Sequence, residues 1–526
     1  MSAKKIALVV VAHQPYIRHC DSNSIGCDAE NDLFFGALSQ TYIPLINMLH
    51  SFEEEHIQAK FSIVLSPVLC SMLSDKLLQE QYVNWLDRCI CLGEKELNRL
   101  SGDKELLKNA ESALKKVRQN KIDFTEKYGR NLIREFSHFA NKGMIEILAT
   151  AGTHAFLPHY ADMTEILNAQ VETGIFSHKY FFGSAPEGFW LPYMGYAPGL
   201  EKVLRSYGIN YTILDSQGVL FAENAPKTGI FAPVRCMNSL VLFARDFHTP
   251  NDIDGEETGF SSNKIYKNQN RDIGYELESD QLGDFITADS ARVNSLFRYW
   301  AKDNDSNSVY DEKKACEQVL LDAKSFLEEK NTKLTKAAEI VKDDVCLVCV
   351  MNAESLGQTW AEGMDWFETV LRTNKDSEFV SGADMLKNQF HLERINPYPC
   401  AASGAGYGED LLDSSNSWML RYTRKMCERM VDLAGRFPDD TGLKARLLNL
   451  GAKELMLCQS GEWAKMLHEG KSPDYVRSRF TAAVTAFTTV FDSLGSNIVS
   501  TDWLTKLEKA HPLFPWMNYR IFSKKM

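Results

Sequence analysis

Polar and aromatic residues follow apolar runs at five places in this chain. They occur at residues 13–16, 152–158, 189–192, 214–218 and 352–354, and they include histidine, tryptophan, aspartate and glutamate side chains. Functional groups at the carboxyl ends of successive strands meet on one face of a barrel. Carboxyl groups placed there can exchange protons with a ligand. The sequence therefore predicts one polar site assembled from distant segments.

The segments before these clusters are candidates for strands. The expected strands are residues 5–12, 60–66, 145–149, 209–214, 240–244 and 345–350. Most are apolar throughout rather than alternating, which is typical of strands buried on both faces. The segments between them are long enough for crossover helices. We therefore expect an α/β fold built on a parallel sheet or barrel.

Three other regions have a different pattern. Residues 75–140 are charged and helical in spacing, which predicts a helical insertion between strands. Residues 248–282 are rich in Asn, Asp, Gly and Ser, which predicts a long surface loop. Beyond about residue 396 the apolar residues recur at helical spacing, as in 418–433, 441–459 and 474–494. We expect this last region to be a separate helical domain.

Composition indicates a globular protein and excludes two classes of partner. The 526 residues are 44% hydrophobic and 24% charged, which suffices for a sizeable core. The net charge of −12 argues against nucleic acid and against an anionic membrane surface. No apolar stretch approaches the roughly 18 residues of a spanning helix. The apolar run at 6–12 is too short for a signal peptide, so we expect a first strand there and a cytoplasmic protein.

The 12 cysteines are scattered along the chain. Cys346 and Cys349 form a CxxC pattern inside an apolar run, and residues three apart on a strand face opposite sides. The pair is therefore a poor metal or redox site. We expect reduced thiols that act as small apolar side chains, and we predict neither a metal nor a cofactor.

The polar clusters lie inside motifs that occur along nearly the whole chain. These motifs include Trp190-Leu191-Pro192, Ala197-Pro198-Gly199, Arg271-Asp272-Ile273-Gly274, Asn352-Ala353-Glu354 and Gln459-Ser460-Gly461-Glu462-Trp463. In this order they resemble glycoside hydrolase family 57, and within it the glycogen branching enzymes. The resemblance implies an incomplete (β/α)7 barrel over residues 1–395, with the helical insertion at about 75–140, and a C-terminal helical domain over 396–526. It also implies a place in α-glucan (glycogen) metabolism, with an α-glucan or oligosaccharide as ligand.

Two positions depart from the family pattern in a way that matters for chemistry. The family's glutamate nucleophile corresponds to Tyr193, and its aspartate acid/base corresponds to Asn352. Retaining cleavage of a glycosidic bond needs two carboxyl groups roughly 5–5.5 Å apart. Asparagine does not titrate usefully, and tyrosine, with an ordinary pKa of about 10, is mostly neutral. The sequence therefore predicts a catalytically inactive pseudoenzyme that binds glucan or a protein partner, which the sequence does not identify.

Two alternatives remain open. Some sialidases use a tyrosine nucleophile, so the chain could be an active 1,4-α-glucan branching enzyme or a related transferase or hydrolase. Tyr193 would then need a base, for which Glu354 and Asp215 are the candidates. The other alternative is a structural or interaction scaffold in which Tyr193 closes the old pocket.

The resemblance also implies which other residues contact a ligand. His13 and His154 are expected in the sugar-binding pocket rather than at a metal, and Asp215 and Glu354 are expected to orient neighbouring groups. Trp190, Trp360 and Trp463 are candidates for stacking on a sugar face, although tryptophan is also a common core residue.

Overall fold

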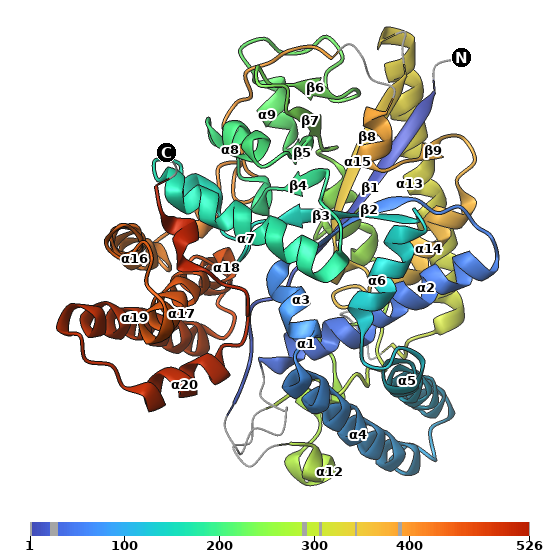
Figure 1. The fold of residues 1–526 in the computed structure, drawn as a ribbon. Helices are drawn as coiled ribbons and strands as arrows, with labels where there is room; N and C mark the ends of the chain where they lie inside the picture. Colours follow the sequence, from blue (N-terminus) through green and yellow to red (C-terminus); the bar gives the residue numbers. More distant parts are fainter. Residues whose placement is uncertain are drawn as a thin grey trace.

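A curled, mostly parallel sheet forms the centre of the molecule (Figure 1). The computed structural model describes residues 3–20, 30–286, 292–303, 308–341, 344–387 and 392–524. The strands are β1 (Lys4–Ala12), β2 (Phe61–Leu65), β3 (Ile145–Thr150), β4 (Gly188–Trp190), β5 (Tyr211–Leu214), β6 (Val234–Arg235), β7 (Val241–Ala244), β8 (Val345–Asn352) and β9 (Glu378–Phe379). All six strands expected from the sequence are confirmed. Strands β4, β6 and β9 were not predicted because two or three residues give no periodic signal.

The sheet order explains how the barrel forms. Neighbouring strands follow the order β6-β7-β5-β4-β3-β2-β1-β8, and β9 also pairs with β1. Every pairing is parallel except that of β6 with β7. An isolated parallel bridge between Arg245 and Val348 brings the end of β7 to β8, and the Asp246 amide donates to the Val348 carbonyl at 2.7 Å. The strands from β7 to β8 thus curl into the incomplete (β/α)7 barrel that the resemblance implied.

Two core clusters account for the continuously apolar strands. On β1, Ala7 and Val9 belong to the cluster inside the barrel, whereas Ile6 and Leu8 belong to the larger cluster between the sheet and its helices. The outer helices are α1 (Asn31–Ala37), α2 (Ile43–Glu54), α3 (Pro67–Leu73), α7 (Thr164–Phe182), α8 (Leu200–Ser206), α9 (Ser216–Leu220), α13 (Glu312–Val341), α14 (Gly363–Thr373) and α15 (Gly382–Leu386). Both faces of the sheet are buried, so an alternating pattern is absent.

The cysteines of the CxxC pattern face opposite sides of the sheet, as predicted. Cys346 packs in the cluster inside the barrel and Cys349 in the outer cluster. Burial raises the pKa of the Cys349 thiol to about 12, which keeps it protonated and unreactive. No disulfide joins the cysteines in the described part of the chain.

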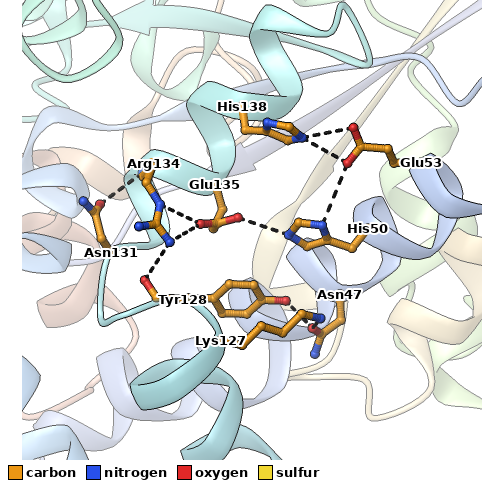
Figure 2. Close-up of polar contacts among 9 residues, drawn as sticks. All are labelled: Asn47, His50, Glu53, Lys127, Tyr128, Asn131, Arg134, Glu135 and His138. Atoms are coloured by element: carbon orange, nitrogen blue, oxygen red, sulfur yellow. Dashed lines mark hydrogen bonds and ion pairs between the residues drawn. The ribbon is translucent and has the colours of Figure 1, made fainter.

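The predicted helical insertion is confirmed. It consists of α4 (Lys76–Arg99), α5 (Lys104–Ile122) and α6 (Leu132–Asn141), and α4 and α5 lie side by side at the lower right of Figure 1. Asp75 and Asp103 cap α4 and α5 by accepting hydrogen bonds from first-turn amides. Figure 2 shows how the insertion joins the barrel helix α2: His50 contacts Glu135 at 3.1 Å, and His138 contacts Glu53 at 3.0 Å.

The segment 248–282 is only partly the surface loop that composition predicted. It contains the short helices α10 (Thr249–Asp254), α11 (Ile273–Glu276) and α12 (Ser279–Leu282). The side chains of Tyr266 and Asp272 within it are fully buried. The reason is anchoring by α13: the buried Lys330 ammonium lies 2.5 Å from Asp252, and Asp322 accepts a 2.5 Å hydrogen bond from Tyr266.

Helices dominate the C-terminal region, as expected. They are α16 (Ser417–Arg436), α17 (Gly442–Cys458), α18 (Gly461–His468), α19 (Pro473–Ser496) and α20 (Thr501–Ala510), and they gather at the left of Figure 1. The periodic segments correspond to α16, α17 and α19, whereas the shorter α18 and α20 were not predicted. The boundary near residue 396 stays a prediction. Across the described ranges, none of the helices has the length and apolar character needed to cross a membrane.

Candidate functional site

A cleft of about 940 Å³ opens at the carboxyl ends of the strands. Six of the nine residues predicted for the site line it: His13, His154, Trp190, Tyr193, Asn352 and Glu354. They come from the ends of β1, β3, β4 and β8 or the turns that follow, so the parallel sheet brings together segments far apart in sequence. The other wall is formed by Glu462, Lys465 and neighbouring residues of α18.

Tyr193 is held in a strained turn after β4. Its φ is 55° and that of Met194 is 52°, in the left-handed region that costs a non-glycine residue about 1–3 kcal/mol. The Tyr193 carbonyl accepts a 2.7 Å hydrogen bond from the Ala402 amide, which helps to fix this turn. His154 is also left-handed, with φ of 51°. Three cleft-lining residues, His154, Tyr193 and Met194, thus have a strained backbone.

The Tyr193 hydroxyl donates a hydrogen bond to Glu462 at 2.5 Å. Burial, together with the negative charge of Glu462, raises the pKa of Tyr193 well above its usual value. The phenol is therefore neutral and tied to a carboxylate from the helical region. Glu462 lies in the motif Gln459-Ser460-Gly461-Glu462-Trp463, but its contact with Tyr193 spans 269 positions, so the local sequence does not indicate it.

Gly461 leaves the space that the Tyr193 ring occupies. A Cβ atom at residue 461 would lie 2.5 Å from Cε2 of Tyr193 and 3.1 Å from the His154 carbonyl oxygen. That carbonyl accepts a 3.3 Å hydrogen bond from the Gly461 amide. Contacts this close mean that any larger residue must push the ring or the helix away. The large residue at 193 and the small residue at 461 fit each other.

The two predicted histidines stack face to face. The ring centroids of His13 and His154 lie 4.0 Å apart with an angle of 6° between their planes. Burial lowers the pKa of His13 to about 3, so its imidazole is neutral. His13 Nδ1 lies 2.8 Å from the Ser66 hydroxyl, which in turn caps α3. The stack is therefore fixed by the turns after β1, β2 and β3.

Three buried polar atoms at this wall have no hydrogen-bond partner within the described ranges. They are Nε2 of His13, Nδ1 of His154 and Nε1 of Trp190. Unpaired buried polar groups are costly and are normally satisfied by protein, water or ligand. Neutral imidazole nitrogens and an indole N–H can exchange hydrogen bonds with uncharged hydroxyl groups. Where the structure describes the chain, no three metal-binding side chains gather in a potential metal site.

Asn352 and Glu354 both line the cleft but belong to different local structures. Asn352 is the last residue of β8 and is exposed, while Glu354 lies in a 3-10 turn that ends the strand. The Gln14 amide donates to Glu354 at 3.2 Å. Burial, and to a smaller degree the charge of Glu462, raises the pKa of Glu354 to about 7. This carboxyl group therefore holds its proton to a higher pH than an ordinary glutamate does.

Asp215 does not line the cleft. Its carboxylate contacts Arg245 at 2.6 Å and accepts a hydrogen bond from the Gln217 amide at the start of α9. Arg245 itself lines the cleft. Both carboxylate oxygens of Asp215 are thus engaged by Arg245 and by the Gln217 amide.

Trp360 and Trp463 lie in the core, which corrects the expectation that their rings are free to stack on a sugar. The Trp360 side chain is 0% exposed and packs against Tyr266 and Trp366, with ring centroids 5.3 and 5.6 Å away. Trp463 is 2% exposed and donates to the Leu457 carbonyl at 2.8 Å. Trp360 follows a strand and Trp463 lies in a helix, and neither position indicates from the sequence that neighbouring side chains cover the ring.

The chain matches two protein-family models. Residues 7–387 match the model described as glycosyl hydrolase family 57, and residues 422–522 match the model described as 1,4-alpha-glucan branching enzyme, C-terminal. A curated relative, a 1,4-alpha-glucan branching enzyme of Thermococcus kodakarensis, is 23% identical over 508 residues, covering 90% of this chain and 71% of the relative.

Solved structures share the whole architecture. The alpha-amylase AmyC of Thermotoga maritima superposes with a TM-score of 0.92 at 27% identity, covering 100% of both chains. The GH57-type branching enzyme of Pyrococcus horikoshii gives a TM-score of 0.88 at 20% identity, covering 100% of this chain and 97% of that one. At this identity the second likeness shows the fold alone. With a family model that spans well over half of its length, this chain belongs to glycosyl hydrolase family 57.

Proposed function

We propose that this protein binds an α-glucan or an oligosaccharide in its cleft without cleaving or transferring it. It would be a branching-enzyme-like pseudoenzyme of α-glucan metabolism. The observation that carries the proposal is that neither family position holds a carboxyl group, since residue 193 is a phenol and residue 352 is an amide. With Asn352 at the acid position, neither half of a two-carboxylate mechanism remains. Loss of such groups commonly lowers rates by about 10³–10⁶.

The binding half of the proposal rests on the cleft. A volume of about 940 Å³ accommodates a small sugar ligand, and the wall keeps His13, His154 and Trp190. Their unpaired polar atoms suit sugar hydroxyl groups. These features favour an open binding site over a scaffold whose pocket Tyr193 has closed.

Affinity electrophoresis in gels containing amylose tests the binding. We expect wild-type protein to be retarded, and the Trp190→Ala variant to be retarded less because it removes an indole from the wall. Tyr180→Ala is the matched control, since Tyr180 is an exposed aromatic residue near the end of α7. Wild-type protein that migrates alike with and without amylose would refute glucan binding.

One observation favours a second candidate, an active enzyme with a tyrosine nucleophile. The 2.5 Å contact between Tyr193 and Glu462 is the distance expected of a nucleophile and its base. In such a reaction the phenol oxygen would attack the anomeric carbon and its proton would pass to Glu462. Glu354, with its pKa of about 7, would protonate the leaving oxygen. In such an enzyme we propose Glu462 as the base, because it contacts the phenol, beside Glu354 and Asp215, the two candidates from the sequence.

The two candidates differ in what the variants do. If the tyrosine acts as a nucleophile, wild-type protein shortens or branches amylose, and Tyr193→Phe and Glu462→Gln each abolish this. If the protein is a pseudoenzyme, wild-type protein leaves amylose unchanged and Tyr193→Phe still binds it. Amylose binding by the Tyr193→Phe variant is the control, because it shows that the variant is folded and that any lost activity reflects the missing hydroxyl group.

A further inference from the structure

A second cavity, of about 450 Å³, lies at the amino-terminal ends of the strands. Its wall includes Lys60, which precedes β2, Glu146 of β3 and Glu187, which precedes β4. The cleft lies at the other ends of the strands, and in the described part of the chain the two cavities share no lining residue. We call this second space the amino-terminal cavity, and it is separate from the proposed glucan-binding cleft.

Glu146 points into the barrel at the start of β3. The residues before and after it pack in the outer core cluster, so Glu146 faces the barrel interior. Its carboxylate accepts hydrogen bonds from the Tyr211 hydroxyl at 2.7 Å, the Ser62 hydroxyl at 3.1 Å and the Ala383 amide at 3.3 Å. All three donors are neutral, and a carboxylate has about four acceptor sites. Glu146 can therefore still accept a hydrogen bond from a ligand.

The three carboxyl groups of this wall differ in how their charges are balanced. Asp384 contacts the ammonium groups of Lys60 at 2.5 Å and Lys387 at 2.7 Å, and despite burial these contacts lower the pKa of Asp384. Burial raises the pKa of Glu146, and the charge of Glu187 adds to the rise. Within the described ranges, neither Glu146 nor Glu187 forms an ion pair. Two lysines against three carboxylates leave the wall with a net negative charge.

Two helices end at the same cavity. Asn141, the last residue of α6, and Phe182, the last residue of α7, both line it. The carboxyl end of a helix carries a partial negative charge, which adds to that of the carboxylates. His178 of α7 does not offset this charge, because burial lowers the pKa of its imidazole. The electric field in the cavity therefore favours a positively charged ligand.

The size of the cavity favours an organic cation over a metal ion. A volume of about 450 Å³ far exceeds that of one ion and lies in the range of small-molecule sites. Among the residues that the structure describes, no three metal-binding side chains converge in the way that a metal ion requires. Phe182, Ala185 and Pro186 give the wall an apolar part that suits a carbon skeleton.

We propose that the amino-terminal cavity binds a small organic molecule that carries a primary ammonium group. The ammonium group would donate charge-assisted hydrogen bonds to the carboxylates of Glu146 and Glu187, and the carbon skeleton would pack against Phe182 and Pro186. Amino sugars and short diamines share this chemistry. The proposal does not depend on glucan binding in the cleft.

Titration calorimetry with matched pairs of compounds tests the proposal. Glucosamine is compared with glucose, and putrescine with 1,4-butanediol, because the members of each pair differ only in amino groups that replace hydroxyl groups. We expect at least one amine to bind, and its neutral partner to bind at least about tenfold more weakly. The amine that binds more tightly distinguishes an amino sugar from a diamine. Glu187→Gln removes the charge of an exposed side chain and should weaken amine binding by about tenfold.

The controls locate the binding and exclude a folding defect. Glu111→Gln changes an exposed glutamate of α5 and should bind the amine as wild type does. Without ligand, Glu187→Gln should unfold at the same temperature as wild type and be retarded equally by amylose. No binding of either amine, equal binding of an amine and its neutral partner, or undiminished amine binding by Glu187→Gln would overturn the proposal. Each of these results leaves glucan binding in the cleft unaffected.

Discussion

The fit between Tyr193 and Gly461 makes a sharp prediction for the Gly461→Ala substitution. The new Cβ would lie 2.5 Å from Cε2 of Tyr193 and 3.0 Å from its hydroxyl oxygen. The ring cannot move freely, because its backbone is left-handed and its hydroxyl is bonded to Glu462. Either the ring is displaced or α18 moves away from the barrel.

The expected cost follows from these contacts. Overpacking a tight site costs about 1–3 kcal/mol, and a lost hydrogen bond to a carboxylate costs about 1.5–3 kcal/mol. Replacing a glycine in a helix by alanine returns up to about 1 kcal/mol. Displacement of the ring would relieve the overpacking but break the hydrogen bond. The full cost of overpacking and the full cost of the lost hydrogen bond therefore do not add. We expect Gly461→Ala to lower the free energy of unfolding by about 2 kcal/mol.

Guanidinium-induced unfolding followed by tryptophan fluorescence measures this change. The matched control is Gly435→Ala in α16, where a new Cβ would have nothing within 4 Å, and it should be neutral or slightly stabilising. In a Tyr193→Ala background the penalty of Gly461→Ala should fall to less than half, since the ring is gone and only the His154 carbonyl oxygen stays close to the new Cβ, at 3.1 Å. An undiminished penalty in that background, or none in the wild-type background, would refute the reasoning.

Two further predictions concern buried charges. Burial raises the pKa of Glu354 from 4.5 to about 7, so between these pH values the unfolded chain loses this proton while the folded protein keeps it, and stability falls as the pH rises. The Glu354→Gln variant should therefore be more stable than wild type by on the order of 2 kcal/mol at pH 8 and equal to it at pH 4. Thermal unfolding at both pH values measures this difference. Equal differences at the two pH values would contradict a titrating Glu354. Lys330 is 0% exposed, and its ammonium lies 2.7 Å from Asp246. The Lys330→Met variant should lower the free energy of unfolding by about 3 kcal/mol, because it leaves a buried carboxylate poorly paired. The control Lys324→Met changes a side chain that is 72% exposed and should leave the free energy of unfolding nearly unchanged in the same denaturant titration.

Much of the barrel could be predicted because its signals are local. Continuously apolar runs located β1, β2, β3, β5, β7 and β8, and polar residues directly after them located most of the cleft. The same runs could not reveal β4, whose three residues are recognisable only through their pairing with β3 and β5. The turn after β4 was also hidden, since nothing in the residue types of Tyr193 and Met194 indicates a left-handed backbone.

The second wall of the cleft could not be predicted for a different reason. Glu462 and Lys465 reach the cleft from α18, and their positions depend on how the helical region packs on the barrel. Packing also determines which tryptophan rings can contact a ligand. Trp190 ends a strand at the cleft, whereas Trp360 and Trp463 have the same side chain but lie in the core. Sequence spacing gives the face of an element, but not what covers that face.

We propose that a carbohydrate cleft persists after its two catalytic carboxylates have been replaced. Incubation of purified protein with amylose, followed by enzymatic debranching and chain-length analysis, tests this most directly. We expect a chain-length distribution identical to that of untreated amylose, under conditions in which amylose retards the protein in a gel. New branches or shortened chains that disappear in the Tyr193→Phe variant would contradict it and would identify Tyr193 as the nucleophile.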